Sequence, residues 1–164
     1  MVMRYRRMVT PAICAFLATI VLFIGCENTA QDHIANGNNF LGKEQWDEAI
    51  IEYTKAIDID PESAVAYNNR GLTYGYKEDW DRAIADFNKA IELDPKHNRA
   101  YFNRGFAYFN NGDYDKAIFD CNIEIELDPT FGLAYKIRGG AYYKKGEIDK
   151  ATADFQTANE LGYK

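Results

Sequence analysis

Residues that build catalytic and metal centres are scarce in this sequence of 164 residues. It contains only two histidines and three cysteines, and His33 and His97 stand far apart with no cysteine beside either. A zinc site, or a nucleophile with its base, needs several such groups close together. No glycine-rich phosphate loop is present, because Gly139 and Gly140 lie inside a helical pattern. We therefore expect no enzymatic activity, no metal and no cofactor.

The chain also lacks an excess of basic residues. Its net charge is −6, and the first 25 residues carry three arginines and no acid, which leaves −9 on the remainder. A protein that binds nucleic acid needs a basic face to neutralise phosphates. The charge therefore argues against a nucleic-acid partner.

The N-terminal residues differ in kind from the rest of the chain. A basic start is followed by AICAFLATIVLFIG, residues 12–25, which carries no charge, and then by a cysteine and polar residues. As a helix this segment would be about 21 Å long, short of the roughly 30 Å hydrocarbon core of a bilayer. We interpret residues 1–25 as an export signal or, alternatively, an uncleaved membrane anchor, with residues 26–29 as a short tether.

The stretch LFIGC, which ends at Cys26, resembles the lipobox of bacterial lipoprotein signal peptides. In that motif a small residue precedes a cysteine that becomes lipidated. Gly25 and Cys26 match it, whereas Phe23 stands where leucine is usual. The resemblance implies lipidation at Cys26 and an extracytoplasmic protein anchored to the membrane of a bacterial cell envelope. The alternative is a cysteine that merely happens to follow a signal peptide.

One segment recurs four times at a spacing of 34 residues. The copies are QWDEAIIEYTKAIDIDP (45–61), DWDRAIADFNKAIELDP (79–95), DYDKAIFDCNIEIELDP (113–129) and EIDKATADFQTANELGY (147–163). Each has apolar residues at helical spacing, and a second helical pattern precedes each. The period predicts an all-α fold, an α-solenoid of four helix-turn-helix repeats with eight antiparallel-paired helices. The predicted repeats are 30–63, 64–97, 98–131 and 132–164, the last of them a C-terminal capping repeat.

The repeat resembles the tetratricopeptide repeat (TPR) family. The second copy meets the family pattern in full, with Tyr67, Gly71, Tyr74, Ala83, Phe87, Ala90 and Pro95. The third copy has Cys121 and Glu124 in place of the second aromatic residue and the second alanine. The fourth has Tyr163 in place of the proline.

Two charged positions change together between the repeats. Arginine recurs as Arg70, Arg104 and Arg138, and aspartate as Asp86, Asp120 and Asp154, whereas the first repeat has Asn36 and Glu52 at these two positions. We predict an Arg–Asp pair inside each of the last three repeats, since charges near a core usually occur paired. A row of arginines that contacts a ligand is the alternative.

The outer faces of the terminal repeats have become polar. Thr152 and Asn159 replace isoleucines of the other second helices, and Asp32 and Asn39 replace small residues of the other first helices. A solenoid needs such capping faces. We therefore expect an array complete at four repeats whose soluble part is monomeric.

The resemblance to TPR proteins implies a concave groove, lined by the first helices, that binds a peptide segment of a partner protein. In the third repeat Phe102, Phe106 and Phe109 form a stripe rotated by one residue, about 100°, from the core stripe. The residues predicted to line the groove are Asn68, Leu72, Tyr76, Arg99, Phe102, Phe106, Phe109, Lys136 and Tyr143. Gly75 and Gly140 are expected to leave gaps beside them. The alternative is that the phenylalanines fill space between neighbouring helices.

The ligand expected in this groove is an apolar or aromatic segment, flanked by acidic residues that meet a rim of Arg99 and Lys136. One version of the family grips a C-terminal carboxylate, and here Asn38, Asn69 and Arg99 match its clamp. Ile34 and Asn103 replace the two other cations, and this loss removes most of the charge-assisted bonding.

Two functions remain open at the level of sequence. The first is an exported, membrane-tethered protein–protein interaction module in the assembly or recruitment of an envelope complex. The second is a structural component of a secretion or pilus-type machine, permanently packed against one partner.

Overall fold

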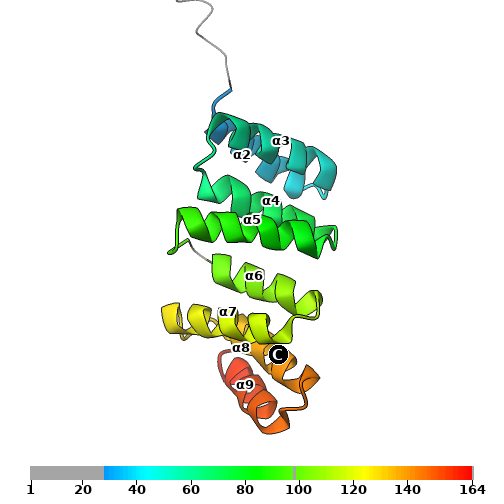
Figure 1. The fold of residues 1–164 in the computed structure, drawn as a ribbon, viewed down its shortest axis with the longest axis vertical. Coiled ribbons are helices and arrows are strands. Elements are labelled where there is room, and N and C mark those ends of the chain that lie inside the picture. The colour runs from blue at the N-terminus through cyan, green and yellow to red at the C-terminus, as the bar shows by residue number, and fades with distance from the viewer. Residues whose placement is uncertain (1–27, 98, 164) are drawn as a thin grey trace, which may run out of the picture.

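The computed structural model describes residues 28–97 and 99–163, which form eight α-helices and, within those ranges, no strand. The first helices of the pairs are α2 (Ala30–Leu41), α4 (Ala64–Tyr76), α6 (Ala100–Asn110) and α8 (Gly132–Lys144). The second helices are α3 (Trp46–Ile59), α5 (Trp80–Leu93), α7 (Tyr114–Leu127) and α9 (Ile148–Glu160). Figure 1 shows the pairs stacked along the long axis of the molecule. The predicted all-α solenoid of helix-turn-helix units is confirmed.

The two helices of a pair approach closely because one of them carries a glycine at the crossing. A Cβ atom added at Gly71 would lie 2.9 Å from the Phe87 ring, and one at Gly37 would lie 2.5 Å from the Tyr53 ring. The aromatic rings therefore fill the space that a side chain would need. Ala107 of the third repeat packs into the same buried cluster as Phe87, so the core continues from one repeat into the next.

The short turn between the helices of each pair uses a left-handed residue. Glu44 and Glu78 both have φ of 59°, and the same place holds Gly112 with φ of 87° and Gly146 with φ of 80°. The left-handed region is sterically costly for residues with a Cβ atom and free for glycine. The same turn is thus built in all four repeats, with strain in the first two.

The predicted Arg–Asp pairs form in all three repeats. In each, Nε and Nη2 of the arginine donate to the two carboxylate oxygens of the aspartate at 2.7–2.8 Å. The third nitrogen, Nη1, donates to a side chain on the second helix of the preceding repeat, namely Thr54, Asn88 or Asn122. Each guanidinium therefore ties its own helix pair together and also joins it to its neighbour. Hydrogen bonding to Asp86 raises the pKa of Arg70.

The first repeat holds the equivalent acid differently. Glu52 Oε2 lies 2.6 Å from Nδ1 of His33, and Lys55 donates to Glu52 Oε1 at 2.6 Å. The hydrogen bond from Lys55, and after it the contact with His33, lower the pKa of Glu52 below its usual 4.5. The first repeat has Asn36 where the other repeats have arginine, yet Glu52 still has basic partners.

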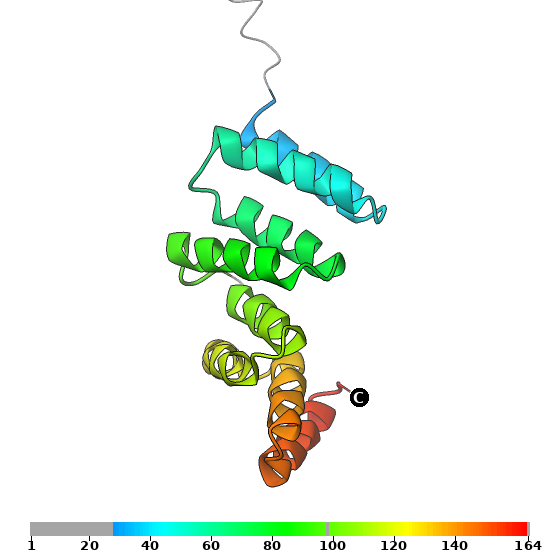
Figure 2. The same ribbon diagram turned by 45° about the vertical axis from the view of Figure 1, so that its right-hand side comes forward.

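The stack twists along its length. In Figure 2, α8 and α9 run steeply across the direction of α2 and α3. At the ends, the four polar residues that replace apolar ones, Asp32, Asn39, Thr152 and Asn159, are exposed. The chain after α9 folds back so that the Tyr163 ring lies against Gly132 at the start of α8.

The predicted signal and Cys26 lie outside the described residues. No helix of the described part is long and apolar enough to cross a membrane.

Candidate functional site

A cavity of about 650 Å³ opens between the first helices of the last three repeats. Its walls come from α4, from α5, from α6 and from α8. The lining residues are Leu72, Gly75, Tyr76, Glu78, Trp80, Phe87, Phe102, Asn103, Phe106, Ala107, Asn110, Leu133 and Ile137. Four of the predicted groove residues are brought together here: Leu72, Tyr76, Phe102 and Phe106.

One wall of the cavity, formed by Trp80, Phe106 and Phe102, is part of a longer row of aromatic rings in mutual contact. The Trp80 ring meets Phe106 edge-on at 6.1 Å between centroids, and Phe106 lies 6.4 Å from Phe102. Phe102 in turn meets Phe131 at 4.8 Å, and Phe131 meets Tyr163 at 6.4 Å. Such edge-on and offset contacts hold rings in defined orientations. The wall is therefore formed before any ligand arrives.

The rings nearest solvent offer a large apolar contact surface. Phe106 is 40% exposed and Tyr76 is 61% exposed. Tyr76 is supported from behind by Trp46, whose ring stacks on it at 5.0 Å. Exposed aromatic surface that borders a hollow is typical of interaction sites.

Phe109, the third phenylalanine of the stripe, does not line the cavity. Its ring fills the space at Gly140, where an added Cβ atom would lie 3.2 Å from it, and it contacts Tyr114 at 5.8 Å. The expected gap at Gly140 is therefore occupied by a neighbouring helix, whereas Gly75 lines the cavity. The stripe thus divides into two rings at the cavity and one between helices.

Asn68 belongs to a chain of amide hydrogen bonds that runs along the first helices. Asn103 Nδ2 donates to Asn68 Oδ1 at 3.0 Å, and Asn68 Nδ2 donates to Asn69 Oδ1 at 3.3 Å. Asn69 Nδ2 then donates to Asn38 Oδ1 at 3.0 Å. The same oxygen also accepts a hydrogen bond from the Tyr53 hydroxyl. Asn68 is itself buried. These asparagines connect α6, α4 and α2 to one another.

Arg99, expected at the rim, is engaged by its own repeat. Its guanidinium donates to Glu124 at 2.7 Å and to Asp128 at 3.0 Å, and lies 3.6 Å from the centre of the Phe131 ring. Glu124 is buried, at the place where other repeats have alanine. Arg99 adopts φ of 66° as the N-cap of α6. The arginine is therefore the partner of a buried acid.

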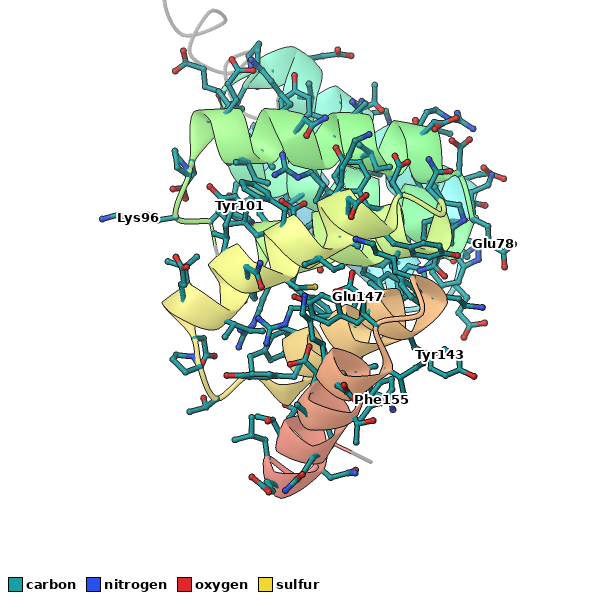
Figure 3. The ribbon with its side chains drawn as sticks, turned by 60° about the horizontal axis from the view of Figure 1, so that its bottom comes forward. Glu78, Lys96, Tyr101, Tyr143, Glu147 and Phe155 are labelled. Carbon is teal, nitrogen blue, oxygen red and sulfur yellow. The ribbon has the colours of Figure 1, made fainter. Side chains whose placement is uncertain are left out.

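The remaining two predicted residues lie on α8 outside the cavity lining. Lys136 is exposed, and Tyr143 is 60% exposed near the C-terminal end of the helix (Figure 3). Sequence reasoning missed Glu78, Trp80, Asn110, Leu133 and Ile137. Only the last two carried a signal, because they stand four residues apart on α8, as Phe102 and Phe106 do on α6.

Neither a metal-binding cluster nor a reactive thiol is found in the part of the chain that the structure describes. Within residues 28–97 and 99–163 no group of three or more histidine, cysteine, aspartate or glutamate side chains could hold a metal ion. Cys121 is fully buried, and burial raises the pKa of its thiol to about 12. A thiol with such a pKa remains protonated and unreactive at neutral pH.

Sequence models of the tetratricopeptide repeat match residues 64–97 and 87–119, and a TPR repeat model matches residues 37–77. Tetratricopeptide repeats, as predicted, are thereby recognised within residues 37–119, and no enzyme family is indicated. A crystal structure of MamA is 29% identical, with a TM-score of 0.77 over 92% of this chain and 86% of that chain.

Two further solved structures are similar to this chain. The TPR domain of Arabidopsis OM64 is 27% identical, with a TM-score of 0.67 over 68% of this chain and 93% of that chain. The first TPR of Spaghetti (RPAP3), bound to the HSP90 peptide SRMEEVD, is 28% identical, with a TM-score of 0.64 over 78% of this chain and 96% of that chain.

Proposed function

We propose that this array of four tetratricopeptide repeats is a protein-binding module that holds an apolar or aromatic segment of a partner protein in the cavity between α4, α6 and α8. The observation that carries the proposal is the preformed aromatic wall, in which Phe106 and Tyr76 remain exposed beside a hollow of about 650 Å³. A hollow of this volume suits a few large side chains of a peptide.

A similar chain, the first TPR of Spaghetti (RPAP3), is bound to a peptide of HSP90 that ends in EEVD. That likeness supports peptide binding as the class of function. The ligand must differ in kind, because Ile34 is buried where a clamp needs lysine, and Asn103 donates to Asn68. A carboxylate would find little charge-assisted bonding at these places.

Phe106 provides the test of the binding site. A photoreactive phenylalanine analogue placed at position 106 in the living cell should form a covalent adduct with a partner protein. The matched control is the same analogue at Phe119 on α7, which is 62% exposed but does not line this cavity.

We expect the adduct from position 106 and not from position 119, and we expect Phe106→Ala to prevent the partner from co-purifying while leaving the melting temperature nearly unchanged. Equal labelling from both positions would contradict the proposal. A large loss of stability with the partner still bound would show that Phe106 serves the core alone.

We propose further that the chain is exported and tethered to the membrane of a cell envelope, where it assists the assembly or recruitment of a complex. The support is the sequence of residues 1–26 alone, with its basic start, uncharged segment and Cys26. Cys26→Ala should release the protein from the membrane fraction or block its processing. A variant that is cleaved and retained as before would refute lipidation.

A further inference from the structure

Glu78 is the one charged residue among those that line the cavity. It follows the last turn of α4 and is exposed (Figure 3). Among the described residues, no hydrogen bond or ion pair holds its carboxylate. The cations next to it in the chain are already engaged, since Lys77 pairs with Asp47 and Arg82 pairs with Asp79. The carboxylate is therefore available to a ligand.

Aromatic side chains line the same cavity as this carboxylate, among them Tyr76, Trp80 and Phe106. The faces of such rings attract a cation, and tryptophan does so most strongly. An arginine or lysine side chain also has an apolar stem that can lie along the rings while its charge reaches an acid. A carboxylate among aromatic rings is thus suited to a basic side chain.

None of the residues that line the cavity is a lysine or arginine, so no basic side chain there would favour an acidic ligand over a basic one. Arg99, the basic residue expected there, donates to Glu124 and Asp128. Lys136 lies on α8 outside the lining. Acidic residues beside the apolar part of a ligand, as the sequence suggested, would meet Glu78 with like charge.

We infer that the cavity recognises a protein segment in which a large apolar side chain is neighboured by an arginine or lysine. The apolar side chain enters between Leu72, Phe102 and Phe106, and the basic group meets Glu78 and the faces of Tyr76 and Trp80. This inference rests on the proposed function and adds the charge of the partner to it.

The test uses the purified full chain and two fluorescein-labelled synthetic peptides. Both peptides contain the same leucine- and phenylalanine-rich core, which is flanked by arginines in one and by glutamates in the other. Binding is measured by fluorescence anisotropy for the wild type, for Glu78→Gln and for Glu44→Gln. Glu44 is the matched control, because it has the same φ of 59° at the same turn of the first repeat and does not line the cavity.

We expect the arginine-flanked peptide to bind the wild type more tightly than the glutamate-flanked one. Glu78→Gln should weaken the binding of the arginine-flanked peptide about fivefold, the effect of losing one exposed ion pair, and Glu44→Gln should leave this binding unchanged. Phe106→Ala should weaken the binding of both peptides.

Three outcomes would overturn the inference. Equal binding of both peptides, with both lost in Phe106→Ala, would remove the charge preference but leave the proposed function intact. Equal effects of Glu44→Gln and Glu78→Gln would assign the preference to the net negative charge of the whole chain. Binding of neither peptide would count against the inference and the proposed function together.

Discussion

Single arginines connect three helices in this molecule. Arg104 donates to both oxygens of Asp120, which is 1% exposed, and to Asn88 of the preceding repeat. Planar guanidinium groups suit this role, because their donors form a rigid fork that fits a carboxylate. The same geometry makes the pair sensitive to the loss of either partner.

Arg104→Ala should therefore lower the free energy of unfolding by about 3–4 kcal/mol, since it leaves a buried carboxylate without its partner. The control is Arg82→Ala, which breaks a pair whose arginine is 61% exposed and should cost far less, because solvent screens that pair. Urea denaturation measures both. Equal losses in the two variants would show that the buried pair contributes no more than a surface pair.

The left-handed turn residues offer a second test at this scale. Glu44→Gly should raise the free energy of unfolding by roughly 0.5–1 kcal/mol, because glycine removes the strain of a Cβ atom at positive φ. The third and fourth repeats already have Gly112 and Gly146 there. The reverse change, Gly112→Glu, should destabilise by a similar amount. A loss of stability in Glu44→Gly would mean that the glutamate side chain has a role of its own.

At the scale of the element, one buried acid accounts for the irregular start of α6. This helix begins at Ala100, two residues later than the starts of α4 and α8 in the repeat register. Arg99 occupies the left-handed N-cap in front of it and reaches Glu124 on α7. Glu124 is buried at 3% exposure where the other repeats have alanine. The later start of α6 and the burial of Glu124 are therefore connected through Arg99.

Arg99→Ala should thus cost about 2–4 kcal/mol, because Glu124 remains buried without a cation. The double variant Arg99→Ala/Glu124→Ala should recover most of this loss, since it restores the alanine of the other repeats. Denaturant midpoints of the two single variants and the double variant form the complete cycle. Additive losses would show that the two side chains do not depend on each other.

At the scale of the whole molecule, the described residues of the middle junction lack an exposed Lys–Asp ion pair that both outer junctions have. Lys77 pairs with Asp47 between the first and second repeats, and Lys145 pairs with Asp115 between the third and fourth. Between the second and third repeats the corresponding places hold Asn111 and Asp81. The cavity lies at this junction and extends to α8. The cavity thus lies at the junction without this ion pair.

Asn111→Lys should complete the missing pair with Asp81 and stabilise the array by roughly 0.2–1 kcal/mol, the usual range for exposed pairs. The gain should disappear in high salt, because salt screens exposed charges. Thermal melts at low and high ionic strength measure it, with Asn110→Lys, one residue away, as the control. A gain of the same size in high salt would exclude an ion pair as its cause.

Much of the architecture follows from the sequence by itself. A period of 34 residues with helical spacing of apolar positions determined four helix pairs, because helix periodicity is a local property and repeated units must stack to bury their cores. The coordinated change of arginine and aspartate likewise determined the pairs later seen between Arg70 and Asp86 and at the two equivalent places. At the cavity, the sequence identified Leu72, Tyr76 and two of the three phenylalanines of α6.

Only the tertiary structure decided which of several chemically similar side chains reach the cavity. Phe109 and Phe106 belong to one stripe, yet Phe109 fills the gap at Gly140 because α8 packs against that end of α6. Arg99 turns to Glu124 because a buried acid far along the chain needs a cation. Glu78 becomes part of the lining because the α4–α5 turn lies beside the rings of α6. Each result depends on contacts between repeats, and the periodic pattern of a single repeat contains no information about such contacts.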